Sequence, residues 1–248
     1  MPCFSFDQRF IVAGASHGIG KDVSLLLNEY GASVICIARN EKVLSILKDE
    51  AKYPEYIFIE QKDLAHDVEH IPTYIRQLKE KYGKFQGMAF CAGTGEVKPV
   101  RAVDLDELRK VFEINFFAPY MMAKAFADKR IHNGWGTSCV FISSVAAIRC
   151  DKGQSVYASS KAALSASVKS IARECASLGV RFNCVSPSAI NTRLLHTNSP
   201  EILEKQAELY PMGVGDVRDV SNLIVYLLSN EAKWITTQNY IIDCGAIL

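Results

Sequence analysis

The chain has 248 residues, a length that suits one α/β domain with a large core. Its 28 Lys and Arg nearly balance 27 Asp and Glu, with no basic block or acidic tail, so neither nucleic-acid binding nor disorder is indicated. No apolar run approaches the roughly 20 residues of a membrane-spanning helix, and residues 1–10 lack the order of a signal peptide. We therefore expect a cytoplasmic protein with no membrane partner.

The eight cysteines are scattered along the chain, and none forms a Cys-x-x-Cys pair. Cys36, Cys139 and Cys184 lie in apolar runs that are typical of strands. We expect buried free thiols in a reducing compartment, with neither a metal site nor a disulfide framework.

A glycine-rich turn follows the first apolar strand, residues 10–13. Gly14, Gly18 and Gly20 come next, and residues 21–30 read as a helix. Glycine lets backbone N–H groups approach a pyrophosphate, and the start of a helix adds a favourable dipole. The alternative is a tight turn without a ligand, but its place between a strand and a helix favours a dinucleotide site.

The residue after the second strand, residues 33–38, indicates which dinucleotide binds. An acidic residue there selects NAD, and a basic one pairs with the 2′-phosphate of NADP. This chain has Arg39 at that point, and His17 in the glycine turn can add a second positive or hydrogen-bonding group. The pattern favours NADP(H), with NAD(H) possible if Arg39 is only a solvated side chain.

Strand and helix continue to alternate after this point. The expected elements are helix 41–51, strand 56–60, helix 68–82, strand 87–92, strand 137–142, strand 180–185, a helix between Asp216 and Ser229, and strand 239–243. Such alternation predicts a parallel sheet with helices on both faces. We find no linker or repeat, so residues 1–248 are predicted to form one dinucleotide-binding and catalytic domain.

An asparagine interrupts the apolar side of a long helix that is opened by an acidic cap at residues 104–107. Asn115 lies there with Phe112 and Phe116, and Pro119 follows four residues on. Proline cannot donate to the Asn115 carbonyl, so we expect a kink and another partner, such as a water. The alternative is a core asparagine that bonds nearby backbone.

Tyr157 and Lys161 lie four residues apart in a stretch with few helix breakers, residues 155–176. On a helix they share one face, and an ammonium near a phenol lowers the pKa of the phenol. Tyr157 is thus a candidate general acid or base. Ser144 ends the strand before it, at the sheet edge where ligands bind in parallel α/β folds. By itself such a pair is more often a solvated helix face with a modest side-chain contact.

The last segment with a functional prediction follows the sixth strand. Residues 187–192 read Pro-Ser-Ala-Ile-Asn-Thr, and residues 193–213 lack a strand pattern but include a helix-like stretch at 201–209. We expect residues 193–213 to form a substrate lid, with an ordinary surface excursion as the alternative.

Together these motifs resemble the short-chain dehydrogenase/reductase family, in particular its 3-oxoacyl-acyl-carrier-protein reductase-like, NADP-preferring members. The resemblance rests on the glycine turn at 13–20, on Asn115, Ser144, Tyr157 and Lys161 in the family's order and spacing, on 187–192, and on 234–238 and 243–245. It covers nearly the whole chain. It implies a single-domain, Rossmann-like, doubly wound parallel α/β sheet of about seven strands.

The resemblance also implies a function and a set of site residues. Hydride would pass between NADP(H) and a small carbonyl or alcohol substrate, most simply as ketone reduction with Tyr157 as general acid, and without a metal. The implied catalytic residues are Asn115, Ser144, Tyr157 and Lys161. The implied cofactor-binding residues are Gly14, Ser16, His17, Gly18, Ile19, Gly20, Arg39, Asp63, Leu64, Cys91, Ala92, Gly93, Tyr157, Lys161, Pro187, Ile190 and Thr192. A homo-oligomer, dimer or tetramer, is implied through the helices that carry Asn115 and Tyr157.

Five positions depart from the family pattern: Ala13 replaces a threonine, Phe90 and Cys91 replace two asparagines, and Ser188 and Cys244 replace glycines. These changes affect stability and cofactor affinity more than the reaction type. Two alternative functions stay open. One is an NAD-dependent alcohol, polyol or steroid dehydrogenase, and the other is a non-catalytic NADP-binding sensor.

Overall fold

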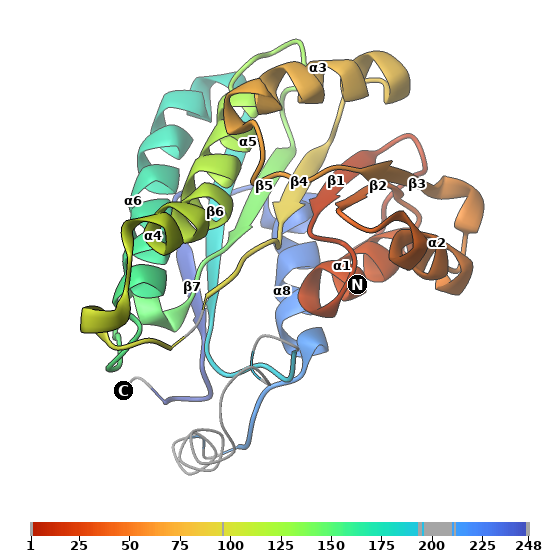
Figure 1. Ribbon diagram of the computed structural model, residues 1–248. Helices are drawn as coiled ribbons and strands as arrows, with labels where there is room; N and C mark the ends of the chain where they lie inside the picture. The colour runs from red at the N-terminus through yellow and green to blue at the C-terminus, as the bar shows by residue number, and fades with distance from the viewer. Residues whose placement is uncertain (1, 96, 193–194, 196–209, 211, 247–248) are drawn as a thin grey trace.

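Seven parallel strands form one sheet in the order β3-β2-β1-β4-β5-β6-β7. The computed structural model describes residues 2–95, 97–192, 195, 210 and 212–246 (Figure 1). The strands are β1 (Arg9–Ala13), β2 (Ser33–Ala38), β3 (Ile57–Gln61), β4 (Gly87–Phe90), β5 (Thr137–Ile142), β6 (Val180–Pro187) and β7 (Asn239–Ile242). The predicted seven-stranded parallel sheet is confirmed, with strand ends displaced by up to two residues.

Helices cover both faces of the sheet (Figure 1). They are α1 (Gly18–Glu29), α2 (Glu41–Glu50), α3 (Ile71–Tyr82), α4 (Leu105–Phe112), α5 (Ala118–Phe126), α6 (Ser155–Cys175) and α8 (Val217–Leu228). Successive residues of a strand point to opposite faces, so β1 feeds two cores. Ile11 packs with α3, α5 and α6, whereas Val12 packs with α1, α2 and α8. This two-sided burial is why the strands read as continuous apolar runs.

The strand order reverses beside β1, and this reversal positions the site. The chain runs outward from β1 through β2 to β3, and then returns to place β4 on the other side of β1. The carboxyl ends of β1 and β4 are joined by a hydrogen bond from the Cys91 N–H to the Ala13 carbonyl, at 2.8 Å. Ligands of doubly wound sheets bind in the crevice at such a reversal.

The long helix after β4 does not continue through Asn115 as an ordinary α-helix. Residues Glu113–Phe117 adopt π-helical geometry between α4 and α5, and the Ala118 N–H donates to the Glu113 carbonyl. The kink expected from Pro119 is therefore a π-helical turn, which widens the ladder where proline lacks its donor. Such turns are frequent at functional sites.

Three sequence predictions have different outcomes here. Cys36, Cys139 and Cys184 are buried free thiols, as expected. Most of the predicted lid, residues 193–213, lies outside the described residues, so the lid remains a prediction, as does the helix at 201–209. Within the described ranges, no helix combines the length and the apolar character needed to cross a membrane.

Candidate active site

The glycine turn packs so closely that its key positions cannot hold a side chain. Gly14 has φ +84°, and a Cβ built on it would lie 2.6 Å from the Ala92 backbone nitrogen. A Cβ on Gly20 would lie 2.2 Å from the Gly14 carbonyl oxygen. The turn, the start of α1 and the residues after β4 are thus held in backbone contact. Gly18 and Ile19, in the first turn of α1, line the crevice, and the first N–H groups of a helix have no partner within it.

A cavity of about 560 Å³ opens in front of this turn. Most of the predicted cofactor residues line it: Gly14, Ser16, His17, Gly18, Ile19, Arg39, Asp63, Leu64, Cys91, Ala92, Gly93, Tyr157, Lys161 and Thr192. Pro187 and Ile190 line an adjoining cavity instead. Gly20 lines neither and acts behind the turn. The structure therefore brings residues from the ends of β1 to β6 to one crevice.

The cavity fits an anionic dinucleotide. Its lining residues include the cationic side chains Arg39, Lys62, Lys110 and Lys161, against one carboxylate, Asp63. The Oδ1 atom of Asp63 accepts a hydrogen bond from the Ala65 N–H at 2.9 Å. A helix N-terminus beside excess positive charge is suited to pyrophosphate, and the volume lies in the usual range for ligand pockets.

Some lining residues were not predicted from the sequence. Lys62 follows β3 in the way that Arg39 follows β2, so the position at a strand end could have identified it. Lys110 and Ile114 come from α4 and the π-helical turn, and Thr94 follows Gly93. Lys110 and Ile114 carry no local signal, because only the packing of that helix beside the sheet brings them to the cavity.

Ser144, Tyr157 and Lys161 meet where the two cavities adjoin. Tyr157 lies in the first turn of α6 and lines both cavities, Lys161 lines the larger one, and Ser144 lines the smaller one. Ser144 follows β5, and its Oγ accepts a hydrogen bond from the Ala146 N–H at 3.1 Å. A Cβ on Gly95 would lie 2.4 Å from Tyr157 Cδ2, so this unpredicted glycine is what lets the chain lie against the ring.

The pKa of Tyr157 differs from the sequence prediction. Burial raises the pKa of the Tyr157 phenol, and a hydrogen bond with Ser144 lowers it only in part. The predicted fall in this pKa is wrong, because the Lys161 ammonium lies 6.0 Å from the ring centroid and donates to the Ile142 carbonyl at 2.8 Å. Tyr157 therefore keeps its proton at neutral pH, as a proton donor needs.

Lys161 is itself strongly perturbed. Its side chain is almost fully buried, and this desolvation lowers its pKa from 10.5 to about 8, an effect that the nearby thiols of Cys184 and Cys91 partly oppose. A charged amine without a carboxylate partner is costly in such a place. Perturbed groups of this kind cluster at functional sites.

This perturbation predicts a stability effect for Lys161→Met. Between pH 8 and 10.5 the unfolded chain retains a proton that the folded chain has lost, so the free energy of unfolding rises with pH across that window. Below pH 8, the charged and buried lysine lowers the free energy of unfolding by roughly 3 kcal/mol. We expect Lys161→Met to raise the free energy of unfolding by about 1–3 kcal/mol at pH 7 and by less near pH 10. The gain at pH 7 is smaller than the full cost of the lysine, because the Ile142 carbonyl loses its hydrogen-bond donor.

Urea denaturation of both proteins at pH 7 and pH 10 measures this difference. The control is Lys169→Met, which changes an exposed lysine of the same helix and should show no gain at either pH. A Lys161→Met protein that is no more stable than the wild type at pH 7 would contradict the prediction.

Asn115 is fully buried and lines neither cavity. Its Oδ1 accepts from the Thr94 N–H at 2.9 Å, and its Nδ2 donates to the Thr94 carbonyl at 2.7 Å and to Ser160 Oγ at 3.0 Å. Asn115 thus behaves as the core asparagine that was the alternative prediction. Its side chain joins Thr94, in the segment after β4, to Ser160 of α6. These hydrogen bonds of Asn115 lie beside Lys161, because a Cβ on Gly93 would lie 3.1 Å from Asn115 Oδ1 and 3.3 Å from Lys161 Nζ.

The adjoining cavity is smaller, at about 200 Å³. Its apolar wall includes Val97, Val145, Ala146, Ile190 and Leu195, and its polar groups include Arg149, Asp151, Gln154, Ser188 and Tyr210. Several of these belong to residues 144–154, which begin at Ser144, or to the predicted lid, residues 193–213. Its position beside Tyr157 makes it the natural space for a substrate.

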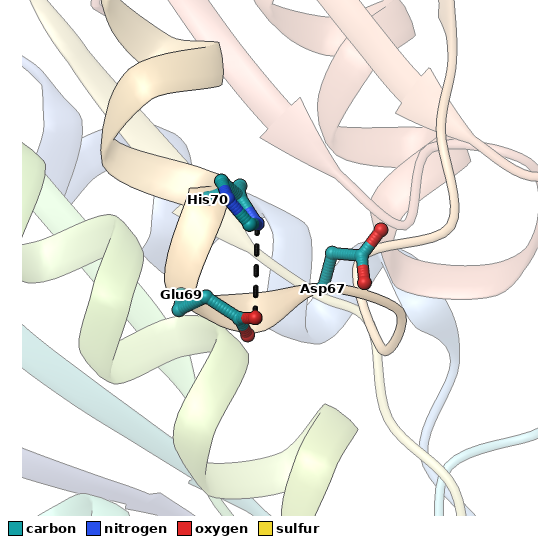
Figure 2. Close-up of side chains that lie close together, drawn as sticks. All are labelled: Asp67, Glu69 and His70. Carbon is teal, nitrogen blue, oxygen red and sulfur yellow. Dashed lines mark ion pairs between the residues drawn. The ribbon is translucent and has the colours of Figure 1, made fainter.

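One group of side chains elsewhere has the composition of a metal site. Asp67, Glu69 and His70 gather in the turn before α3 (Figure 2), with His70 Nδ1 at 3.7 Å from Glu69 Oε1. All three are exposed, and none of them lines the two cavities described above. Exposed acidic groups like these are common without an ion, so the cluster supports no metal site.

Comparison with known proteins agrees with this arrangement. A family model described as enoyl-(acyl carrier protein) reductase matches residues 14–246. L-xylulose reductase of Caenorhabditis elegans is 31% identical over 242 residues, covering 96% of this chain and 95% of the relative. A 3-oxoacyl-[acyl-carrier-protein] reductase of Rickettsia typhi is 31% identical over 240 residues, covering 96% of both chains.

Solved structures agree as well. A 7α-hydroxysteroid dehydrogenase complexed with NADH and 7-oxoglycochenodeoxycholic acid is 28% identical, with a TM-score of 0.89, covering 97% of this chain and 95% of the other. A 4-hydroxyisoleucine dehydrogenase complexed with NADH is 26% identical, with a TM-score of 0.87, covering 96% of this chain and 98% of the other.

The fold, the dinucleotide cavity and these relatives define an oxidoreductase that uses a nicotinamide cofactor to interconvert alcohol and carbonyl groups of small molecules. The chain belongs to the short-chain dehydrogenase/reductase family. The predictions of the family, of the fold and of an enzyme are thereby confirmed.

Proposed function

We propose that the chain reduces a ketone with NADPH and that Tyr157 is the general acid. The observation that carries this proposal is the meeting of Ser144, Tyr157 and Lys161 at the junction of a dinucleotide-sized cavity and a smaller one. Burial raises the pKa of Tyr157, so the phenol holds the proton that ketone reduction requires of a general acid.

The roles follow from position. When bound, the reduced nicotinamide supplies the hydride that the carbonyl carbon accepts. Ser144 and Tyr157 donate hydrogen bonds to the carbonyl oxygen and stabilise the negative charge that develops there. Tyr157 then gives up its hydroxyl proton, so the phenol O–H bond breaks as the O–H bond of the alcohol product forms. Lys161 donates to the Ile142 carbonyl and is proposed to bind the cofactor, and Asn115 positions the segment beside Lys161 through its bonds to Thr94.

The residues that hold the cofactor are the lining residues of the larger cavity. The first turn of α1 and the glycine turn suit the pyrophosphate, Asp63 and Leu64 the adenine, and Lys161 the nicotinamide ribose. Pro187, Ile190 and Thr192 are proposed to hold the nicotinamide side, where the two cavities adjoin. Cys91 and Ala92 support the turn by backbone contact.

Arg39 supports NADP over NAD. It is exposed at the end of β2 and lines the cavity beside Lys62. Its backbone carbonyl accepts from Gln61 Nε2 at 3.0 Å, and across the described part of the chain no carboxylate forms an ion pair with its guanidinium. A free guanidinium is suited to a 2′-phosphate. Two solved relatives are complexes with NADH, so NAD remains the alternative.

Arg39→Ala is expected to weaken NADPH binding about 10- to 100-fold and to change NADH binding by less than about threefold, because one charged hydrogen-bonded contact is lost. Fluorescence titration of both cofactors measures this effect. Arg173→Ala, at an exposed arginine of α6 that lies outside both cavities, is the matched control. Unchanged NADPH affinity in Arg39→Ala, or a wild-type preference for NADH, would contradict the assignment.

The substrate proposal rests on the relatives and on the small cavity. L-xylulose and 3-oxoacyl groups, named in the two curated relatives, both contain a ketone. We propose a small ketone for this chain as well. Consumption of NADPH by the purified protein with members of a ketone panel would support ketone reduction, whereas turnover only of alcohols with NAD would favour the dehydrogenase alternative.

We also propose a homo-oligomer through α4, the π-helical turn and α5. Leu105, Leu108, Phe117 and Tyr120 expose large apolar side chains there, and Phe116 packs its ring near Phe117 and Tyr120. A second copy would remove this surface from water. Sedimentation of the purified protein tests the assembly. A cytoplasmic location remains a prediction.

A further inference from the structure

Two of the residues that depart from the family's glycines contact the same segment beside the smaller cavity. Ser188 follows β6, and its Oγ lies 2.6 Å from the Tyr210 hydroxyl. Cys244 follows β7, and its Sγ accepts a hydrogen bond from the Met212 N–H at 3.1 Å. Each departure therefore adds a side-chain bond that glycine cannot make, and both bonds hold residues 210 and 212 against the ends of the last two strands.

The backbone around these bonds is also held. The Ser188 N–H donates to the Ile242 carbonyl at 2.9 Å, and the Gly213 N–H donates to the Tyr210 carbonyl at 3.0 Å. Cys244 has φ +56°, a backbone conformation that costs a non-glycine residue free energy. The residue whose Sγ accepts this hydrogen bond is therefore held in a strained conformation. The hydroxyls of Ser188 and Tyr210 are consequently fixed relative to the sheet.

Ser188 and Tyr210 both line the smaller cavity, together with Ser144 and Tyr157. A pair of hydroxyls has two hydrogens, and their mutual bond uses one. Neither side chain makes another hydrogen bond to any residue that the structure describes. The pair therefore retains one donor and several lone pairs for a ligand in a cavity of about 200 Å³, where the catalytic hydroxyls are close neighbours.

We propose that the Ser188–Tyr210 hydroxyl pair binds a second oxygen of the substrate and so determines specificity for ketones that carry an additional hydroxyl or carbonyl group. This inference rests on the proposed ketone reduction. The pair also disfavours substrates that offer it only carbon, because its remaining donor would then lose water without gaining a partner.

The test compares matched ketones with and without a neighbouring hydroxyl: acetoin with butanone, and α-hydroxycyclohexanone with cyclohexanone. We expect the wild type to favour the hydroxyketones by at least about tenfold in kcat/KM, mainly through KM. Ser188→Ala and Tyr210→Phe should each remove most of this preference. The double variant should lose little more, because the two hydroxyls act as one unit.

Several readouts separate specificity from structural damage. Loss of the pair should lower the ratio of kcat/KM for each hydroxyketone to that for its matched simple ketone, whereas damage to the cavity would lower turnover of all four ketones alike. Tyr226→Phe, at an exposed tyrosine of α8, is the matched control and should keep the preference.

The outcomes also separate this inference from the proposed function. Ketone turnover by the wild type without preference for hydroxyketones, or a preference that survives both substitutions, would overturn the inference and leave ketone reduction intact. Absence of NADPH-dependent turnover with every ketone would overturn the proposed function, and the inference with it.

Discussion

Tyr157→Phe is expected to lower kcat about 100- to 10,000-fold while leaving cofactor affinity within about threefold of the wild type. The substitution removes only the hydroxyl that would protonate the product oxygen, and general acid catalysis of this kind contributes about 10²- to 10⁴-fold. The phenylalanine ring keeps the contact with Gly95, so the walls of both cavities persist. Single-turnover rates with saturating NADPH and the best ketone of the panel measure the loss.

Cofactor titration and thermal unfolding accompany this measurement, because a misfolded variant would also lose activity. Tyr226→Phe should behave as the wild type, since Tyr226 lies on α8 and lines neither cavity. A Tyr157→Phe protein with full turnover would refute the role of Tyr157. A variant that also fails to bind NADPH would indicate a structural role in place of proton transfer.

Gly14→Ala is expected to weaken cofactor binding at least about 100-fold and to lower the melting temperature. The new Cβ would lie 2.6 Å from the Ala92 nitrogen and 2.7 Å from its Cα. Both atoms are backbone, so no side-chain rotation relieves the clash, and the glycine turn must move away from the end of β4. That movement misplaces the N–H groups that would face a pyrophosphate.

Gly134→Ala is a matched control for this substitution. Gly134 also has φ +84°, but a Cβ on it meets no atom within 4 Å. It should cost only the roughly 1–2 kcal/mol of a left-handed alanine and leave cofactor binding unchanged. Calorimetric titration with NADPH and thermal unfolding of both variants separate strain from the clash. Equal behaviour of the two variants would show that the packing of Gly14 against Ala92 is unimportant.

The local elements and the order of the motifs are predictable from the sequence. Continuous apolar runs predicted the strands, because a strand of a parallel sheet is buried on both faces. Local sequence patterns also predict the glycine turn before α1, Ser144 at the end of β5, and the one-turn spacing of Tyr157 and Lys161. Each of these features depends on neighbours within a few residues, so it can be predicted without knowledge of the fold.

The way in which these elements meet depends on packing between distant parts of the chain. Whether Lys161 lowers the pKa of Tyr157 depends on where its ammonium points, and the structure directs it to the Ile142 carbonyl while burial raises the pKa of the phenol. Spacing along a helix carries no information about desolvation.

The partners of Asn115, the close approach of Gly95 to Tyr157, and the pairing of Ser188 with Tyr210 likewise join segments that lie far apart in the chain. A sequence pattern reports the period with which side chains are buried, and so predicts helices and strands. It does not report which distant groups share a cavity, because the packing of the whole sheet and its helices determines that choice.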